Sequence, residues 1–83
     1  MANTMVVALD SRGNPDYGQD PDRPVYGVKP QVAVVLSLGQ ASAVCLEWIK
    51  SNDLGGGNWT GGDVRDSGGK LVARISYNGR VWQ

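Results

Sequence analysis

One stretch of the sequence, residues 37–52 (SLGQASAVCLEWIKSN), has the apolar spacing of an amphipathic helix. Ser37, followed three residues later by Gln40, forms a capping-box pair that predicts the start of this helix. The segment Asn52-Asp53-Leu54-Gly55 offers a left-handed residue that predicts its end. At 100° per residue, one arc collects the apolar side chains of Leu38, Ala41, Cys45, Trp48 and Ile49. A stripe this wide is typical of a helix that packs on a sheet, so the rest of the chain must supply that sheet.

Two apolar segments before the helix predict strands. Residues 5–9 and residues 31–36 are rich in β-branched side chains and apolar on both faces. Such strands suit the inside of a sheet, and we expect residues 31–36 to be central. Residues 11–30 between them contain many Gly, Pro and Asp residues, which predict one long loop with at most a brief strand at Val25-Tyr26. A loop of about twenty residues is unusual in so short a chain, and it is expected to be functional or mobile, or ordered by packing of Tyr17 and Tyr26.

The segment after the helix predicts a three-stranded meander. Residues 63–65 form a short strand, and residues 70–77 alternate between apolar and polar side chains. Asn78-Gly79 is a strong signal for a two-residue type I′ hairpin turn. This turn would set Ile75 opposite Trp82 on the inner face, and the predicted core therefore contains Ile75, Trp82 and Trp48 of the helix.

The predicted fold is α+β, with one helix packed on a small antiparallel-rich sheet. The expected order is strand, long loop, strand, helix and three-stranded meander, within a single domain that spans residues 1–83. Eighty-three residues are enough for one small core.

The composition argues against enzymatic and metal chemistry. The chain has no His and one Glu, so general acid–base catalysis has few candidate residues. Asp16, Asp20 and Asp22 lack the spacing and the closing bidentate carboxylate of a calcium loop. The glycine-rich run at residues 55–62 lacks the Gly-Lys-Ser/Thr of a phosphate loop. We therefore expect no catalytic residue, no metal and no cofactor.

The sequence also bears on the compartment. Cys45 is the only cysteine, so no internal disulfide is possible and a reducing compartment is expected. The N-terminal residues lack the charged and apolar regions of a signal peptide, and no apolar stretch is long enough to span a bilayer. The expected location is the cytoplasm.

Charge is distributed unevenly along the chain, although eight basic and eight acidic residues cancel overall. Residues 1–30 contain four Asp against three basic residues, whereas residues 54–83 contain four basic residues against two Asp. The basic residues of the second segment, here called the basic strip, are Arg65, Lys70, Arg74 and Arg80. Trp59 and Tyr26 are the expected aromatic anchors of a partner-binding site beside this strip. The alternative interpretation is an ordinary solvated sheet face.

A resemblance to a known group of proteins rests on the second half of the chain. A strand, then Ser-Leu-x-Gln-Ala at the start of a helix, then Gly-x-Leu-Val-Ala and Asn-Gly-Arg-x-Trp in a C-terminal meander, is similar to small phage-encoded accessory proteins, anti-CRISPR proteins among them. In this sequence the pattern covers roughly residues 31–83. The residues that carry it are Ser37, Leu38, Gln40, Ala41, Leu71, Val72, Ala73, Asn78, Gly79, Arg80 and Trp82.

The resemblance implies a non-enzymatic phage or mobile-element protein that acts in the cytoplasm of a bacterial host cell. Such a protein would bind and block a larger protein assembly, with a CRISPR effector complex as the implied partner. Two other functions use the same surface and stay open at this point. One is a small nucleic-acid-binding module, and the other is a structural protein whose two-sided apolar strands form a homodimer.

Overall fold

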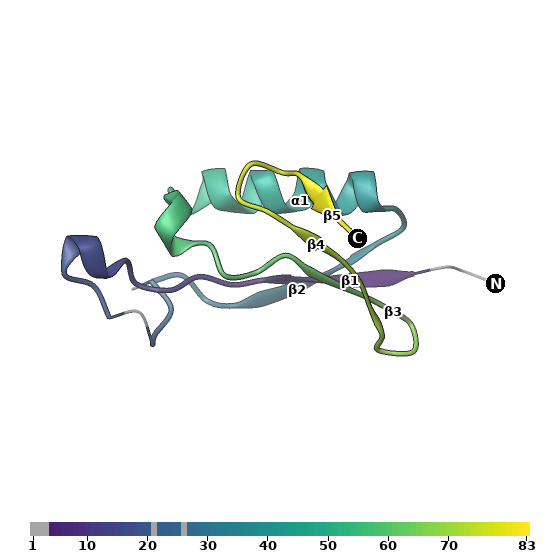
Figure 1. Cartoon of the computed structure of the whole chain (residues 1–83), viewed down its shortest axis with the longest axis horizontal. Helices are drawn as coiled ribbons and strands as arrows, with labels where there is room; N and C mark the ends of the chain where they lie inside the picture. Colours follow the sequence, from purple (N-terminus) through teal and green to yellow (C-terminus); the bar gives the residue numbers. More distant parts are fainter. Residues whose placement is uncertain (1–3, 21, 26) are drawn as a thin grey trace.

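The computed structural model of the chain describes residues 4–20, 22–25 and 27–83. One long helix and five strands make up its regular structure (Figure 1). The elements in chain order are β1 (Met5–Leu9), the short 3-10 helix η1 (Pro15–Tyr17), β2 (Gln31–Val35), α1 (Leu38–Ser51), the short 3-10 helix η2 (Gly56–Asn58), β3 (Asp63–Asp66), β4 (Leu71–Ile75) and β5 (Val81–Trp82).

All five strands join one antiparallel sheet in the order β2-β1-β3-β4-β5, and α1 covers one face of it (Figure 1). This arrangement confirms the predicted α+β fold and its order of strand, loop, strand, helix and meander. β1 lies inside the sheet, as predicted. The expectation that residues 31–36 are central is wrong, because β3 occupies the other side of β1 and leaves β2 at the edge. An apolar pattern on both faces does not distinguish an edge strand from a central one.

Local signals decide both ends of α1. Ser37 is the N-cap, and its side-chain oxygen accepts a hydrogen bond from the Gln40 N–H at 3.0 Å. The Gln40 side chain in turn accepts from the Leu36 N–H at 2.7 Å. At the other end Asp53 adopts the left-handed conformation, with φ at 57°, and the Leu54 N–H donates to the Ile49 carbonyl at 3.0 Å. The predicted start and end of the helix are confirmed.

The core lies between α1 and the sheet. Its largest fully buried side chains are Ile75, Val7, Val35, Val64 and Cys45. The predicted burial of Ile75 is confirmed, and Trp48 is half-buried against this core. Side chains alternate along each strand, so the core positions fix which residues face away from the helix.

The predicted register of the C-terminal hairpin is wrong by one residue. Ile75 pairs with Val81, and Arg74 pairs with Trp82. Gly79 has a positive φ of 85° but Asn78 does not, so the turn is not type I′, which needs both. The Ser76 N–H instead donates to the Arg80 carbonyl at 2.9 Å, which closes a longer turn. Because a shift of one residue exchanges the two faces of a strand, Trp82 is 52% exposed rather than in the core.

The helix explains this register. The Ser42 hydroxyl of α1 donates to the Gly79 carbonyl at 2.6 Å. A side chain at position 79 would meet Leu46 of the helix, so the turn rests closely on α1 and requires Gly there. Contacts with the helix, rather than the Asn-Gly pair alone, therefore decide how the hairpin closes.

The loop between β1 and β2 is held by backbone hydrogen bonds. Ser11 is buried, pairs with Trp59 as an isolated bridge, and its hydroxyl accepts from the Val25 N–H at 3.1 Å. The Gly13 N–H donates to the Arg23 carbonyl at 2.9 Å. Tyr17 is 80% exposed, so its packing does not order the loop. The predicted strand at Val25-Tyr26 is absent at Val25, and Tyr26 lies outside the described residues.

Cys45 provides a test of the core. Burial raises the pKa of its thiol from 9.0 to about 11. The thiolate is the reactive form, so we expect alkylation by iodoacetamide at pH 8 to be at least ~10-fold slower in the folded protein than in urea. Because the unfolded thiol ionises first, Cys45 should make folding less stable as the pH rises from 9 towards 11. Urea titrations at pH 8 and 10, with Cys45→Ala as control, measure this loss of stability. Equal alkylation rates in the folded protein and in urea would contradict the burial of Cys45.

Candidate functional site

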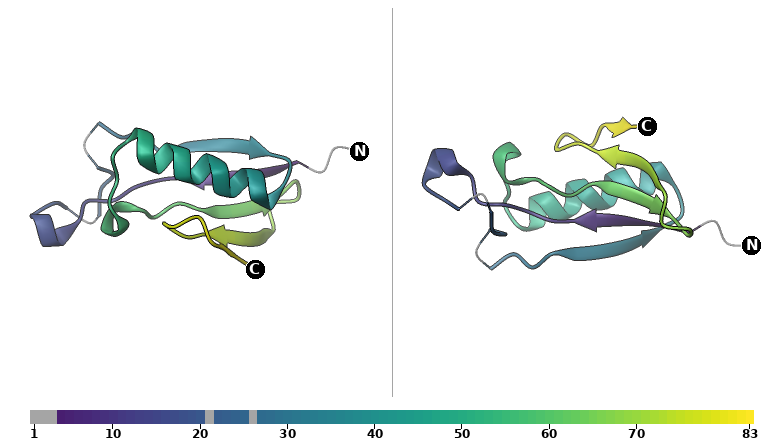
Figure 2. Two further views of the ribbon diagram at one scale, coloured as in Figure 1. Left: turned by 90° about the horizontal axis from the view of Figure 1, so that it is seen from above. Right: turned by 60° about the horizontal axis from the view of Figure 1, so that its bottom comes forward.

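One face of the sheet is left uncovered by the helix. In the right-hand view of Figure 2, α1 lies behind the sheet, and no described segment crosses in front of the strands. We call this the outer face. Strand alternation and register place on it Val6 and Ala8 of β1, Val32 and Val34 of β2, Asp63 and Arg65 of β3, Leu71 and Arg74 of β4, and Trp82 of β5.

Trp82 lies between two arginines on the outer face. Arg74 is its direct neighbour across the β4–β5 pair. The guanidinium carbon of Arg80 lies over the Trp82 ring, 4.3 Å from the ring centroid. This distance is typical of a cation–π contact, which contributes about 0.5–1 kcal/mol at an exposed site. We refer to Arg74, Arg80 and Trp82 as the Trp82 cluster.

The charges of the Trp82 cluster are only partly neutralised. Arg74 Nε donates to the Asp63 carboxylate at 2.8 Å. Both side chains are accessible to solvent, so this pair is worth little to stability, about 0–1 kcal/mol. No carboxylate lies within ion-pair distance of Arg80 among the residues that the structure describes. The cluster therefore keeps an excess of positive charge beside an exposed aromatic ring.

Two shallow hollows flank Trp82. One, of about 330 Å³, lies on the Arg80 side and includes Ser76, Tyr77 and Asn78. The other, of about 360 Å³, lies on the Arg74 side and includes Leu71 and Val72. A side chain from a partner that entered either hollow would meet both the indole ring and a guanidinium. Such combinations of Trp and Arg are common where binding energy is concentrated.

The other two members of the basic strip lie toward the opposite end of β4. Arg65 is exposed, and its guanidinium donates to the Gly69 carbonyl in the β3–β4 turn at 3.1 Å. Lys70 belongs to this turn rather than to β4, which begins at Leu71. A bulge in the β3–β4 pair sets Leu71 opposite Arg65, whereas the unbroken alternation expected over residues 70–77 would have put Leu71 on the inner face with Ile75, so that expectation is wrong for Leu71. The four basic residues thus extend along the meander instead of forming one group.

Trp59, predicted as a partner-binding anchor, has structural contacts on the helix side. Its indole N–H donates to the Ile75 carbonyl at 3.0 Å. Its ring lies 5.9 Å from the Trp48 ring, tilted by 58°, and packs against the core. Trp59 is half-buried by these contacts and does not belong to the Trp82 cluster. Tyr26, the second predicted anchor, lies outside the described residues.

An apolar row along β2 was not among the site residues expected from the sequence. Val32 and Val34 are 69% and 65% exposed, and Leu36, directly after the strand, is similarly exposed. These side chains extend the outer face to the β2 edge of the sheet, which is the edge opposite the Trp82 cluster, and they lie next to the half-buried Val6 and Ala8. The signal was present, because residues 32–36 are all apolar and both faces of the strand therefore carry apolar side chains. This apolar pattern predicted a strand buried on both faces, but in the structure the outer face of β2 is exposed to solvent.

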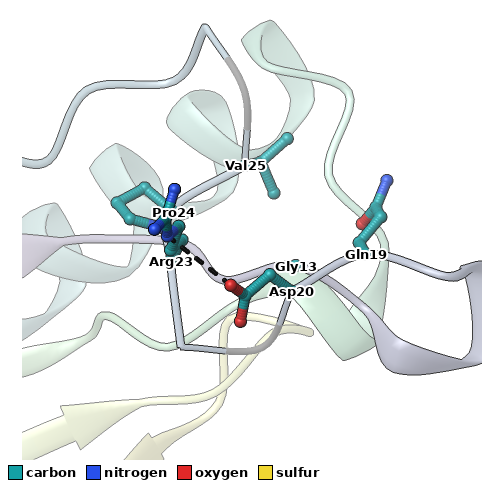
Figure 3. A pocket seen from close by; sticks show the side chains of 6 residues that line it. All are labelled: Gly13, Gln19, Asp20, Arg23, Pro24 and Val25. Atoms are coloured by element: carbon teal, nitrogen blue, oxygen red, sulfur yellow. Dashed lines mark ion pairs between the residues drawn. The ribbon is translucent and has the colours of Figure 1, made fainter.

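A further hollow, of about 480 Å³, lies in the loop between β1 and β2 (Figure 3). It is lined by Gly13, Gln19, Asp20, Arg23, Pro24 and Val25. The Arg23 guanidinium and the Asp20 carboxylate lie 3.5 Å apart and are both largely exposed. Since these opposite charges pair with each other, they leave no strong net charge for a ligand.

The described part of the chain contains no group of three or more His, Cys, Asp or Glu residues that would suit a metal ion. In the same residues, no helix has the length and apolar character needed to cross a membrane. Comparisons with protein-family models, with curated proteins and with solved structures found no significant match.

Proposed function

We propose that this protein is a non-enzymatic binding protein that attaches through the outer face of its meander to an acidic surface of a larger protein assembly and blocks it. The observation that carries this proposal is the Trp82 cluster, an exposed indole on an uncovered sheet face, with the Arg80 guanidinium over its ring and Arg74 as its cross-strand neighbour. Trp82 would act as the anchor, and Arg74 and Arg80 would oppose carboxylates of the partner. Arg65 and Lys70 would extend the contact along β4.

The apolar content of the outer face favours a protein partner over nucleic acid. Exposed side chains of Leu71, Val32 and Val34 share this face with the arginines. Protein interfaces are rich in aromatic residues and Arg around an apolar centre. A nucleic-acid backbone would meet the positive charges but would leave the valines without an apolar partner. The formal net charge of zero also provides no long-range attraction to polyanions.

The resemblance of residues 31–83 to anti-CRISPR proteins supplies the first assembly to test. A CRISPR effector complex offers the large protein surface that this proposal requires. On this proposal the protein acts by occupying that surface, and no covalent bond is made or broken. Binding to single-stranded nucleic acid by stacking on Trp82 is the alternative that the same cluster supports, and the experiment separates the two.

Site-specific photo-crosslinking in bacteria that express a CRISPR effector complex tests the proposal. A benzoylphenylalanine replaces Leu71, which borders the Trp82 cluster and is exposed. Matched controls carry the same group at Glu47 of α1 and at Tyr17 of η1, both exposed and away from the outer face. We expect a discrete protein adduct from position 71 and none from position 47 or 17. Adducts to nucleic acid alone, or equal protein adducts from all three positions, would contradict the proposal.

A further inference from the structure

The edge strand β2 has none of the features that usually protect a sheet edge. β2 is five residues long, and its register with β1 is regular throughout. No charged residue and no proline occurs from Gln31 to Leu36. Natural edge strands are usually short, bulged, charged or interrupted by proline, because their outward N–H and C=O groups can pair with another strand. The opposite edge, β5, is protected by its length of only two residues.

The chemistry of β2 matches that of a second copy of itself. In an antiparallel pair of identical strands related by a two-fold axis, the numbers of any two facing residues add up to the same total. Only an even total places the helix-side residues of one copy opposite the helix-side residues of the other, and only then do the outward N–H and C=O groups line up. The register with the greatest overlap is centred on Ala33 and sets Val32 of one copy opposite Val34 of the other.

No electrostatic term opposes this pairing. The paired segments carry no charge, and the whole chain has a formal net charge of zero. Val32 and Val34 are largely exposed in the single chain, and cross-strand contacts between such β-branched side chains stabilise a sheet. In Figure 2 (right) β2 forms the lower border of the sheet, and no described segment lies beyond it.

We infer that β2 pairs antiparallel with β2 of a second copy and joins the two five-stranded sheets into one continuous sheet. The two-fold axis passes through the sheet at Ala33, so both helices lie on one side and both outer faces on the other. The homodimer presents two Trp82 clusters in the same direction, one on each side of the axis. This inference concerns the oligomeric state and does not rest on the proposed function.

The contact is small. Pairing through one strand buries less surface than the ~1,200–2,000 Å² of a stable complex, so the dimer is expected to be reversible and to depend on concentration. Sedimentation velocity across a series from about 1 µM to 1 mM therefore measures it. The wild-type protein should change from monomer to dimer within this range. A protein that stays monomeric at every concentration would overturn the inference.

Two double variants at exposed positions test the register. Val32→Lys with Val34→Lys sets ammonium groups opposite each other at both sites, and we expect it to stay monomeric throughout the series. Val32→Glu with Val34→Lys sets a carboxylate of one copy opposite an ammonium of the other at both sites, and it should restore the dimer. Leu71→Lys, on the outer face but away from the edge, is the control and should dimerise as the wild type does. Circular dichroism verifies folding; a dimer of the double-lysine variant, or a monomer of the folded variant with mixed charges, would overturn the pairing.

Discussion

Replacing Trp59 with Ala should destabilise the folded protein by about 3 kcal/mol. The substitution removes a ring that packs against Trp48 and the core, and it removes the hydrogen bond to the Ile75 carbonyl. It also loosens the isolated bridge between Trp59 and Ser11, which ties the loop after β1 to the segment before β3. A loss of this size is a large fraction of the stability of so small a domain. Urea titration followed by circular dichroism measures it.

Trp82→Ala is the matched control for this prediction. Trp82 is half exposed and contributes mainly its contact with Arg80, so its removal should cost less than about 1 kcal/mol. Trp59→Phe keeps a ring beside Trp48 but removes the hydrogen bond and the five-membered part of the indole, so it should cost less than Trp59→Ala, about 1–2 kcal/mol. If Trp82→Ala destabilises the protein as much as Trp59→Ala does, the assignment of inner and outer faces is wrong.

The parts of the fold that local chemistry determines could be predicted from the sequence. Ser37 and Gln40 begin α1, and Asp53 ends it, because caps act on the backbone groups next to them. The apolar stripe then required a sheet. The β-branched apolar run of residues 5–9 located β1, and the alternation of apolar and polar residues located β4. Each of these signals is confined to a few neighbouring residues.

The errors arose where contacts between distant residues decide the outcome. Asn78-Gly79 alone favours a two-residue turn, but Ser42 and Leu46 of the helix hold Gly79 in a longer one. The position of β2 at the edge depends on which strand takes the other side of β1, which no local pattern in β2 records. The first error exchanged the two faces of β5 and hid the exposed Trp82, and the second left the exposed apolar row of β2 unrecognised.

The candidate site was therefore predicted in part. Arg74 and Arg80 were identified from charge segregation, and the structure brings them together around Trp82. Trp82 itself was assigned to the core, since the predicted register turned it inward. A shift of one residue in the β4–β5 register decides whether Trp82 packs in the core or lies on the surface.

Reversing both charges of the Trp82 cluster, by Arg74→Glu with Arg80→Glu, should weaken partner binding about 100-fold or more while the fold persists. Both side chains are exposed, so their replacement should change stability little. Against an acidic partner the change replaces attraction with repulsion at two points. In addition, the new carboxylate at position 74 would lie beside Asp63 and increase the local negative charge. The matched control is Lys29→Glu with Lys50→Glu, which makes the same change in net charge at exposed positions away from the cluster.

The most direct test of the outer-face binding site is the affinity of these two variants for the protein captured by photo-crosslinking from position 71. Titration calorimetry or surface plasmon resonance, at low and at moderate salt, compares both variants with the wild-type protein. We expect the Arg74/Arg80 reversal to bind about 100-fold or more weakly, with the larger loss at low salt, and the Lys29/Lys50 reversal to bind as the wild type does. Wild-type affinity of the folded Arg74/Arg80 variant, or an equal loss in both variants, would contradict a binding site on the outer face.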